Sequence, residues 1–215
     1  RHKARGGRGH PQGCPLGMTF ILGLTGSIGM GKSTTAEMFA DEGLPVWDAD
    51  ATVHRLYQPG QPAALAVGAL FPTAIDPDGS VNRAALRTLI QADPAVLDSL
   101  NAAVHPLVAE DRAQFLLAHA SAPIVLLDVP LLYESRIDTA CDAVAVVTVP
   151  PEVQRDRVLS RGAMTEAEFQ TILARQLPDA EKRARATYII PTTSLEAARR
   201  AVKDVLASIR RTQHA

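Results

Sequence analysis

The stretch Phe20 to Thr34, FILGLTGSIGMGKST, carries the residues with the clearest chemistry in the chain. Its section from Gly26 to Ser33 fits G-x-x-x-x-G-K-[ST], the phosphate loop of many nucleotide-binding proteins. The glycines let backbone N–H groups turn inward around phosphate oxygens, and the helix that follows adds partial positive charge at its N-terminus. We expect Lys32 to reach the β- and γ-phosphates of ATP and the Ser33 hydroxyl to ligate Mg²⁺. The alternative is a glycine-rich turn that matches by chance.

A phosphate loop requires a strand before it and a helix after it. The apolar run Phe20 to Thr25 predicts the strand, and Ser33 to Glu42 predicts the helix, which ends at Gly43, a suitable C-terminal cap. The order of strand, loop and helix therefore agrees with the motif.

Two carboxylates follow the next predicted strand, Leu44 to Trp47. The carboxyl ends of parallel strands face the ligand in an open sheet, so Asp48 and Asp50 are expected near the phosphate loop. Because residues i and i+2 of a strand share a side, the pair would point together. Their chemistry would be that of a general base or of outer contacts to a metal ion. Alternatively, Asp50 caps a helix beginning at Ala51.

Three more strands are predicted in the second half of the chain. Ala122 to Val129 carries Asp128 near its end, which resembles a Walker B strand and places Asp128 beside the water shell of Mg²⁺; a helix cap or a structural role is the alternative. Ala143 to Val149 and Tyr188 to Ile190 complete the set. Strands alternating with helices predict an α/β fold of the P-loop NTPase type, with five parallel strands.

The residues between the second and third strands, 51–120, offer helical segments and no convincing strand. They read as helices at Ala51 to Tyr57, Pro62 to Leu70, Arg83 to Ala92, Pro94 to Ala103 and Pro106 to His119. We interpret this stretch as a helical insertion that binds the phosphate acceptor. His105 would lie where one helix ends and the next begins, either in a structural role or as a substrate contact.

Residues 152–183 are expected to form a lid. A helix through Leu159 carries clustered arginines, and Thr165 with Glu168 forms a capping box that starts a helix through Gln176. Such a lid would close over ATP and bring positive charge to the transferred phosphoryl group. We favour Arg161 because it lies at the bend, although each arginine could instead belong to a solvated face.

Composition limits the remaining possibilities. The chain has 215 residues, 47% of them hydrophobic, and a net charge of −1. Residues 1–17 carry four cations and no acid, which leaves −5 on residues 18–215 and argues against a general nucleic-acid surface. We interpret residues 1–17 as a disordered basic leader or an expression remnant, with a targeting arm as the alternative. No apolar run is long enough to span a membrane, and two cysteines give no disulfide framework, which fits a cytoplasmic protein.

Several motifs in order along the chain resemble those of the dephospho-CoA kinase family: GSIGMGKST, WDADATVHRLY, NAAVHPLV, LLDVPLLYE and an R-x-x-x-R…T-x-x-E…R-Q stretch. The resemblance runs from Met18 to near the C-terminus. It implies a P-loop kinase with a helical CoA-binding subdomain and a lid. It also implies transfer of the ATP γ-phosphate to the ribose 3′-hydroxyl of dephospho-CoA, the last step of coenzyme A synthesis, with Mg²⁺.

The resemblance further implies roles for individual residues. The nucleotide contacts of the family fall on the phosphate loop and the start of its helix, at Gly29, Met30, Gly31, Lys32, Ser33 and Thr34. The catalytic carboxylate corresponds to Asp50. The His-Pro element of the acceptor subdomain corresponds to His105 and Pro106, and the lid arginine to Arg161.

Two positions depart from the family pattern. Where many members carry Arg a few residues beyond the catalytic acid, this chain has His54 followed by Arg55. We expect His54 to contact the acceptor, with Arg55 as the alternative cation. Residues 186–192 read ATYIIPT and lack the usual Asp and Asn, so we expect the adenine edge to be read by backbone groups.

Two other functions fit the phosphate loop. One is another P-loop small-molecule kinase, acting on a nucleoside, a nucleotide or a shikimate-like acceptor. The other is a nucleotide-gated regulator without enzymatic activity. The favoured interpretation has ATP and dephospho-CoA as small-molecule partners, no nucleic acid or membrane partner, and a monomer or small homo-oligomer.

Overall fold

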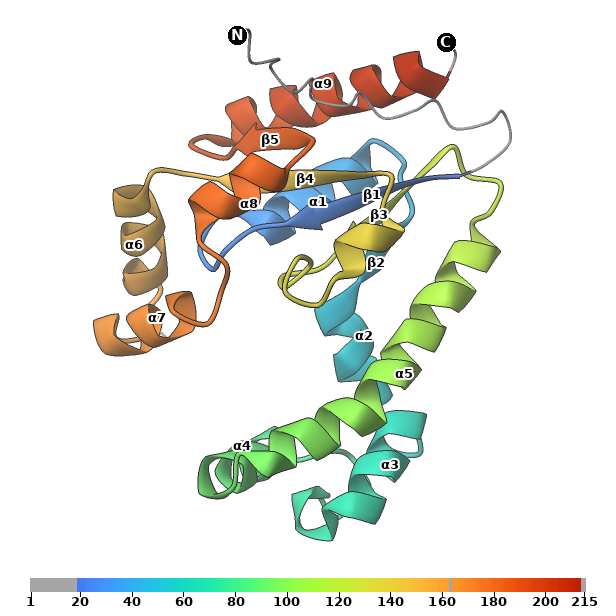
Figure 1. Cartoon of the computed structure of the whole chain (residues 1–215), viewed down its shortest axis with the longest axis vertical. Coiled ribbons are helices and arrows are strands. Elements are labelled where there is room, and N and C mark those ends of the chain that lie inside the picture. The colour runs from blue at the N-terminus through green and yellow to red at the C-terminus, as the bar shows by residue number, and fades with distance from the viewer. Residues whose placement is uncertain (1–18, 163, 214–215) are drawn as a thin grey trace, which may run out of the picture. The chain divides into compact units, whose positions relative to one another are not determined.

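The computed structural model describes residues 19–162 and 164–213 (Figure 1). The chain divides into two compact units, Arg1–Val46 with Ser121–Ala215, and Trp47–Ala120, and each is described by itself. The predicted leader, residues 1–17, lies outside the described residues.

A five-stranded sheet organises the first unit. Its strands are β1 (Phe20–Thr25), β2 (Val46–Asp48), β3 (Ile124–Asp128), β4 (Ala143–Thr148) and β5 (Tyr188–Pro191), in the order β2-β3-β1-β4-β5. β1 pairs in parallel with β3 and β4, and β4 pairs in parallel with β5. β3 is buried along its whole length and β4 along nearly all of it, because helices or loops cover both faces. The predicted α/β fold with a five-stranded parallel sheet is confirmed.

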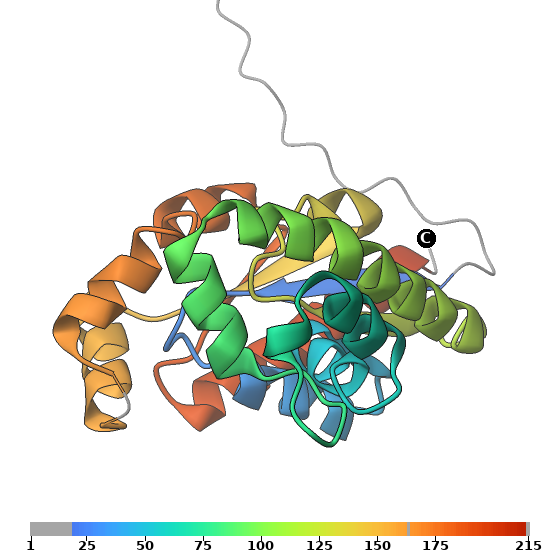
Figure 2. The ribbon, with the colours of Figure 1, turned by 90° about the horizontal axis from the view of Figure 1, so that it is seen from below.

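Helices cover this sheet and extend beyond it. They are α1 (Lys32–Asp41), α6 (Pro151–Ser160), α7 (Glu166–Leu173), α8 (Asp179–Arg185) and α9 (Leu195–Gln213). α1 and α9 pack against each other and share a core with β1 that includes Leu22, Phe39 and Ile209, all fully buried. In Figures 1 and 2, α6 and α7 stand beyond the carboxyl end of β4. The carboxyl ends of the central strands are therefore bordered by α1 and by α6.

In the lid region, the sequence correctly predicted where α7 begins but not where it ends. Thr165 and Glu168 form the predicted capping box, in which each side chain bonds the backbone N–H of the other residue. The helix ends at Leu173, three residues before the predicted end at Gln176. A further short helix, α8, follows; its sequence DAEKRAR has no apolar periodicity that would have predicted it.

The second unit is helical and has its own core. Its helices are α2 (Ala49–Leu56), α3 (Pro62–Leu70), α4 (Arg83–Ala92) and α5 (Ala95–Ala118), with a short 3₁₀ turn, η1 (Pro72–Ala74). A cluster that includes Leu56, Val67, Leu86, Leu100 and Val104 is buried among them. An isolated antiparallel bridge between Ile75 and Val81 is added to the predicted helices.

One prediction for this unit is wrong. Pro94–Ala103 and Pro106–His119 were expected to be two helices, but α5 runs continuously from Ala95 to Ala118 with Pro106 inside it. An internal proline costs a helix ~3 kcal/mol. Buried or half-buried residues on both sides of it, Val104 and Leu107 among them, pack into the core of the unit and offset that cost. Among the described residues, no helix is both long and apolar enough to cross a membrane.

Candidate active site

The loop between β1 and α1 adopts a backbone that only glycine accommodates easily. Gly29 has φ 77° and Gly31 has φ 86°, both in the left-handed region. A Cβ atom on Gly29 would lie 2.5 Å from Val158 Cγ2, and one on Gly31 would lie 3.1 Å from Thr192 Oγ1. The two glycines therefore meet a conformational requirement and a packing requirement together.

Two predicted site residues meet at the carboxyl ends of β1 and β3. Lys32 Nζ donates a hydrogen bond to Asp128 Oδ1 at 2.6 Å, and Asp128 is only 2% exposed. Asp128 ends β3 and lies opposite Leu24 in the parallel register with β1, so the sheet itself sets this contact. The helix-cap alternative for Asp128 is wrong, because the residues after it form turns before η2 (Ile137–Ala140), whose N-cap is Arg136. The carboxylate holds the lysine ammonium beside the loop.

Side chains from distant parts of the unit hold the loop by its peptide groups. Gln154 Nε2 donates to the Ile28 carbonyl at 2.7 Å, and Thr192 Oγ1 donates to the Met30 carbonyl at 2.6 Å. The Met30 side chain is 2% exposed, and its sulfur accepts the N–H of Val149. Of the predicted nucleotide contacts, Met30 can therefore face a ligand only through its backbone.

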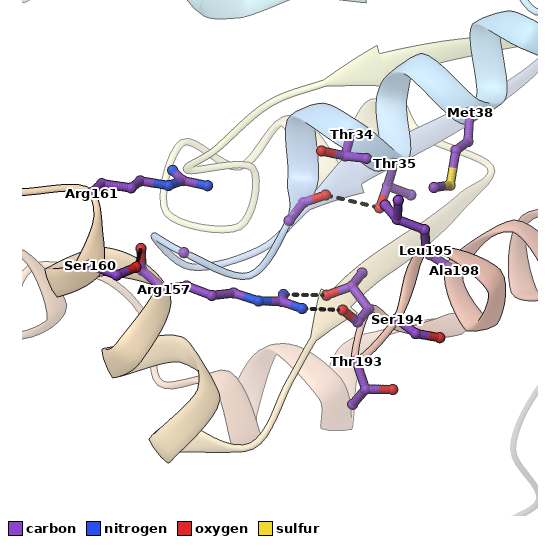
Figure 3. A pocket seen from close by; sticks show the side chains of 13 residues that line it. Thr34, Thr35, Met38, Arg157, Ser160, Arg161, Thr193, Ser194, Leu195 and Ala198 are labelled. Atoms are coloured by element: carbon purple, nitrogen blue, oxygen red, sulfur yellow. Dashed lines mark hydrogen bonds between the residues drawn. The ribbon is translucent and has the colours of Figure 1, made fainter.

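A cavity of about 440 Å³ opens beside the loop (Figure 3). It is lined by the loop glycines Gly29 and Gly31, by Thr34 of α1, by Arg161 at the end of α6, and by residues 192–195 between β5 and α9. Its volume lies within the range of small-molecule sites. The exposed hydroxyl of Ser33 lies in the first turn of α1, between the cavity-lining glycine and Thr34.

Arg157 closes one side of this cavity by joining two of its walls. Its guanidinium donates to the Thr192 carbonyl at 2.6 Å and to Thr192 Oγ1 at 3.3 Å, as the dashed lines in Figure 3 show. Since the same hydroxyl donates to Met30, the contacts link α6, the residue after β5 and the phosphate loop. Arg157 therefore stabilises the wall of the cavity through Thr192.

The other lid arginines differ from one another. Arg155 forms an ion pair with Glu166 at 2.8 Å, with both side chains largely exposed. Arg161 is exposed and forms no ion pair within the described residues, and its side chain extends toward the cavity in Figure 3. Arg175 is exposed and does not line the cavity. Of these cations, Arg161 is the one available to a ligand there.

In the second unit, Asp48 and Asp50 have different surroundings. β2 ends at Asp48, which is the N-cap of α2: its Oδ1 accepts the N–H of Ala51 at 2.9 Å. Asp50 is the second residue of the helix and is exposed. Two expectations are therefore wrong: the two acids do not share a side of one strand, and Asp50 is not the helix cap. The carboxylate of Asp50 is free of a capping role.

His54 and His105 are both exposed. His54 lies four residues after Asp50 on α2, so the two share a face of the helix. His105 lies within α5 and not between two helices, as had been predicted. Both imidazoles are presented on helix surfaces of the second unit.

The most connected acid of this unit is Asp111 of α5, which sequence reasoning missed. Its carboxylate accepts hydrogen bonds from Trp47 Nε1 at 2.9 Å, Thr52 Oγ1 at 3.3 Å and the Arg55 guanidinium at 2.5 Å. Burial alone would raise the pKa of Asp111, but the hydrogen bonds from Trp47 and Arg55 outweigh burial and lower it. Arg55 is thus paired with Asp111. The neighbouring His54 side chain forms no hydrogen bond or ion pair within the part of the chain that the structure describes.

Comparisons with known proteins agree with this arrangement. The family model described as dephospho-CoA kinase matches residues 20–196. A dephospho-CoA kinase from Cereibacter sphaeroides is 62% identical over 196 residues, which cover 91% of this chain and 98% of that protein. One from a Jannaschia species is 54% identical, over 89% of this chain and 98% of its own length. The chain belongs to the dephospho-CoA kinase family. It is therefore an ATP-dependent kinase that acts in the final step of coenzyme A synthesis.

A solved structure matches the fold as well. The crystal structure of TT1252 from Thermus thermophilus aligns with a TM-score of 0.73 at 36% identity, over 89% of this chain and 98% of that one. The dephospho-CoA kinase sequence therefore folds as its P-loop motif predicts.

The donor set beside the phosphate loop suits Mg²⁺. Magnesium in kinases is held by one or two protein oxygens together with substrate phosphates, and not by a cage of side chains. The exposed Ser33 hydroxyl and the carboxylate of Asp128 supply such oxygens. The described part of the chain contains no group of three or more His, Cys, Asp or Glu residues that could hold a metal.

Sequence reasoning missed three side chains of this dephospho-CoA kinase site. Thr192 follows the last strand, and its place at a carboxyl strand end in a parallel sheet could have singled it out. Gln154 and Gln176 bond the loop residue Ile28 from positions more than 100 residues away, and no local pattern marks them.

Proposed function

We propose that the chain transfers the γ-phosphoryl group of ATP to the ribose 3′-hydroxyl of dephospho-CoA in the cytoplasm, with Asp50 as general base. The observation that carries the proposal is the contact of Lys32 with Asp128 beside a glycine loop that opens on a cavity of about 440 Å³. A buried carboxylate that fixes a lysine at a phosphate loop fits phosphoryl transfer, in which positioning and electrostatic stabilisation dominate.

The nucleotide half of the reaction uses the first unit. The nucleoside occupies the cavity, with backbone groups near Thr192 reading its base, and the triphosphate lies along the loop. The inward-facing N–H groups of the loop and the N-terminus of α1 stabilise its negative charge. Lys32 moves its contact from Asp128 to the β- and γ-phosphates, and Arg161 approaches the transferred group when residues 152–183 close as a lid.

Mg²⁺ would be held by the Ser33 hydroxyl, with Asp128 contacting its water shell. When bound, it neutralises charge on the β- and γ-phosphates. Gly26, Gly29, Met30, Gly31 and Thr34 complete the nucleotide contacts through their backbone.

The acceptor half uses the second unit, Trp47–Ala120. Asp50 accepts the proton of the 3′-hydroxyl while that oxygen attacks phosphorus, and the exposed imidazoles of His54 and His105 bind dephospho-CoA. The exposure of all three side chains on helix surfaces supports this role, because an acceptor must reach them from solvent.

An acceptor panel tests the proposal. ADP release is measured with dephospho-CoA, adenosine, AMP and shikimate, and the product is located by ³¹P NMR. We expect fast turnover with dephospho-CoA alone and a new phosphate on the 3′-oxygen. Fast turnover with another acceptor would favour a different small-molecule kinase, and tight ATP binding without acceptor-dependent ADP release would favour a nucleotide-gated regulator.

A further inference from the structure

The segment after α7 reaches back to the phosphate loop. The Ile28 N–H donates to Gln176 Oε1 at 3.2 Å, between residues 148 positions apart in the chain. The carbonyl of the same residue accepts from Gln154 of α6. Both polar groups of the Ile28 backbone are thus held by side chains from the lid region.

A carboxylate in the turn after β3 holds the residue next to Gln176. The N–H of the next residue, Leu177, donates to Glu134 Oε1 at 2.7 Å. The same carboxylate oxygen lies 3.0 Å from Lys182 Nζ, whose side chain is fully buried. Lys182 Nζ does not meet hydrogen-bond geometry there, but the separation makes an ion pair, the only compensation seen for its charge within the described residues.

The charge state of this anchor is fixed. Burial alone would raise the pKa of Glu134, but the Leu177 N–H and the Lys182 ammonium outweigh it and hold that pKa below its usual value. Glu134 follows the same strand as Asp128, which holds Lys32. Asp128 at the end of β3 therefore holds Lys32, and Glu134 in the turn that follows holds the segment that carries Gln176.

The contact lies on a part of the loop that does not line the cavity. Gly29 and Gly31 line the cavity, whereas Ile28 does not. Lys32, which serves the terminal phosphates, lies at the Asp128 side of the loop. The neutral carboxamide of Gln176 accepts the Ile28 N–H through Oε1 and brings no charge to the loop.

We infer that Gln176 is a positioning residue that links the lid to the phosphate loop next to the place where the terminal phosphate of ATP binds. A change of this side chain therefore alters the affinity for ATP more than the affinity for ADP. The inference deepens the proposed function and rests on it for the identity of the nucleotide. A neutral side chain is required, since an acid at this position would repel the γ-phosphate.

Gln176→Glu separates this role from that of a simple tether. Glutamate keeps the size of the side chain and an acceptor for the Ile28 N–H, but adds negative charge. Gln176→Ala removes the carboxamide and with it the acceptor of the Ile28 N–H. The matched control is Gln170→Glu, which makes the same change at an exposed residue of α7 that bonds Glu166 and not the loop.

The measurement is the affinity for ATP and for ADP, each by calorimetry without acceptor, together with kcat and the KM for ATP. We expect Gln176→Glu to weaken ATP binding about tenfold more than ADP binding and to lower kcat by about tenfold. Gln176→Ala should change the ATP-to-ADP affinity ratio and kcat in the same direction but by less. For Gln170→Glu, the affinities and kcat should stay within about twofold of the parent values.

The inference is overturned if Gln176→Glu binds and turns over ATP like the parent while Gln176→Ala is impaired, because that pattern belongs to a tether. It is also overturned if ATP and ADP affinities fall equally. Melting temperatures check folding, and if the glutamate variant does not fold, the ATP-to-ADP ratio of Gln176→Ala decides in its place. The binding assay contains no acceptor, so its outcome is independent of whether dephospho-CoA proves to be the substrate.

Discussion

The two units of the chain prepare for chemistry in different ways. In the first unit, side chains from α6, from the turn after α7 and from the residue after β5 hold the phosphate loop by its peptide groups, and Lys32 is held by a buried acid. In the second, Asp50, His54 and His105 stand exposed on helices, and the acid with most contacts, Asp111, binds the unit together. Under the proposed function, the contrast is between a nucleotide site formed before binding and an acceptor site whose groups gain their partners from the ligand.

We expect the largest change in turnover from a substitution of Lys32 in the first unit. We expect Lys32→Ala to lower kcat by about 10³-fold, because the charge developing on the phosphoryl group loses its main side-chain donor. Asp128→Asn is the matched variant, since it removes the same ion pair but keeps the lysine. Its kcat should fall far less. Equal losses in steady-state assays of the two variants would mean that the contact, and not the lysine, matters.

A smaller effect is expected at the wall of the cavity. Thr192→Val removes the donor to the Met30 carbonyl and a partner of Arg157, so the KM for ATP should rise about five- to tenfold. That rise corresponds to about 1–1.4 kcal/mol, the lower part of the ~1–3 kcal/mol cost of an unsatisfied buried group. The value of kcat at saturating ATP should change little. Thr193→Val, an exposed neighbour in the same cavity wall, is the control. If both variants raise KM equally, the contacts of Thr192 are not what shapes the site.

The smallest effect on turnover is expected at Asp111 in the second unit. Asp111→Asn should lower the free energy of unfolding by about 1–3 kcal/mol, because the carboxylate accepts from Trp47, Thr52 and Arg55. Urea unfolding measures it, with the exposed Glu110→Gln on the same helix as control.

This stabilisation also predicts a pH dependence. The pKa of Asp111 is lowered in the folded protein, so its contribution is complete above the ordinary value of 3.8 and is lost as the pH falls through the folded-state pKa below it. Unfolding of the parent should therefore show an extra loss of stability below pH 3.8 that Asp111→Asn lacks. Identical acid profiles for the two proteins would contradict the assignment.

The sequence predicted the fold well because its strongest signals are local. Each strand lies in a short, largely apolar run, and the capping box is encoded by Thr165 and Glu168 within four residues. The division of α5 at Pro106 was predicted wrongly, since packing on both sides of the proline overrode a local cost. α8 was missed because its short polar sequence has no periodicity.

For the site, the sequence identified residue types and missed the contacts that fix them. Lys32 and Asp128 were each predicted to lie at the phosphate loop, but their contact with each other was not predicted. Asp48, and not Asp50, proved to be the helix cap, because the helix begins at Ala49, two residues earlier than predicted. The contact of Gln176 with Ile28 arises only from tertiary folding, and nothing in the neighbourhood of either residue encodes it.

The acids at the start of α2 give the most direct test of the central claim, that Asp50 is the base of a dephospho-CoA kinase. The measurement is kcat with saturating ATP and dephospho-CoA for Asp50→Asn and Asp48→Asn, with ATP affinity measured alongside. Asparagine is as good an N-cap as aspartate, so Asp48→Asn keeps the helix start and isolates the charge. The account predicts a loss of about 10²-fold or more for Asp50→Asn with ATP binding unchanged, and near-normal turnover for Asp48→Asn. Normal turnover by Asp50→Asn, or a loss confined to Asp48→Asn, would contradict it.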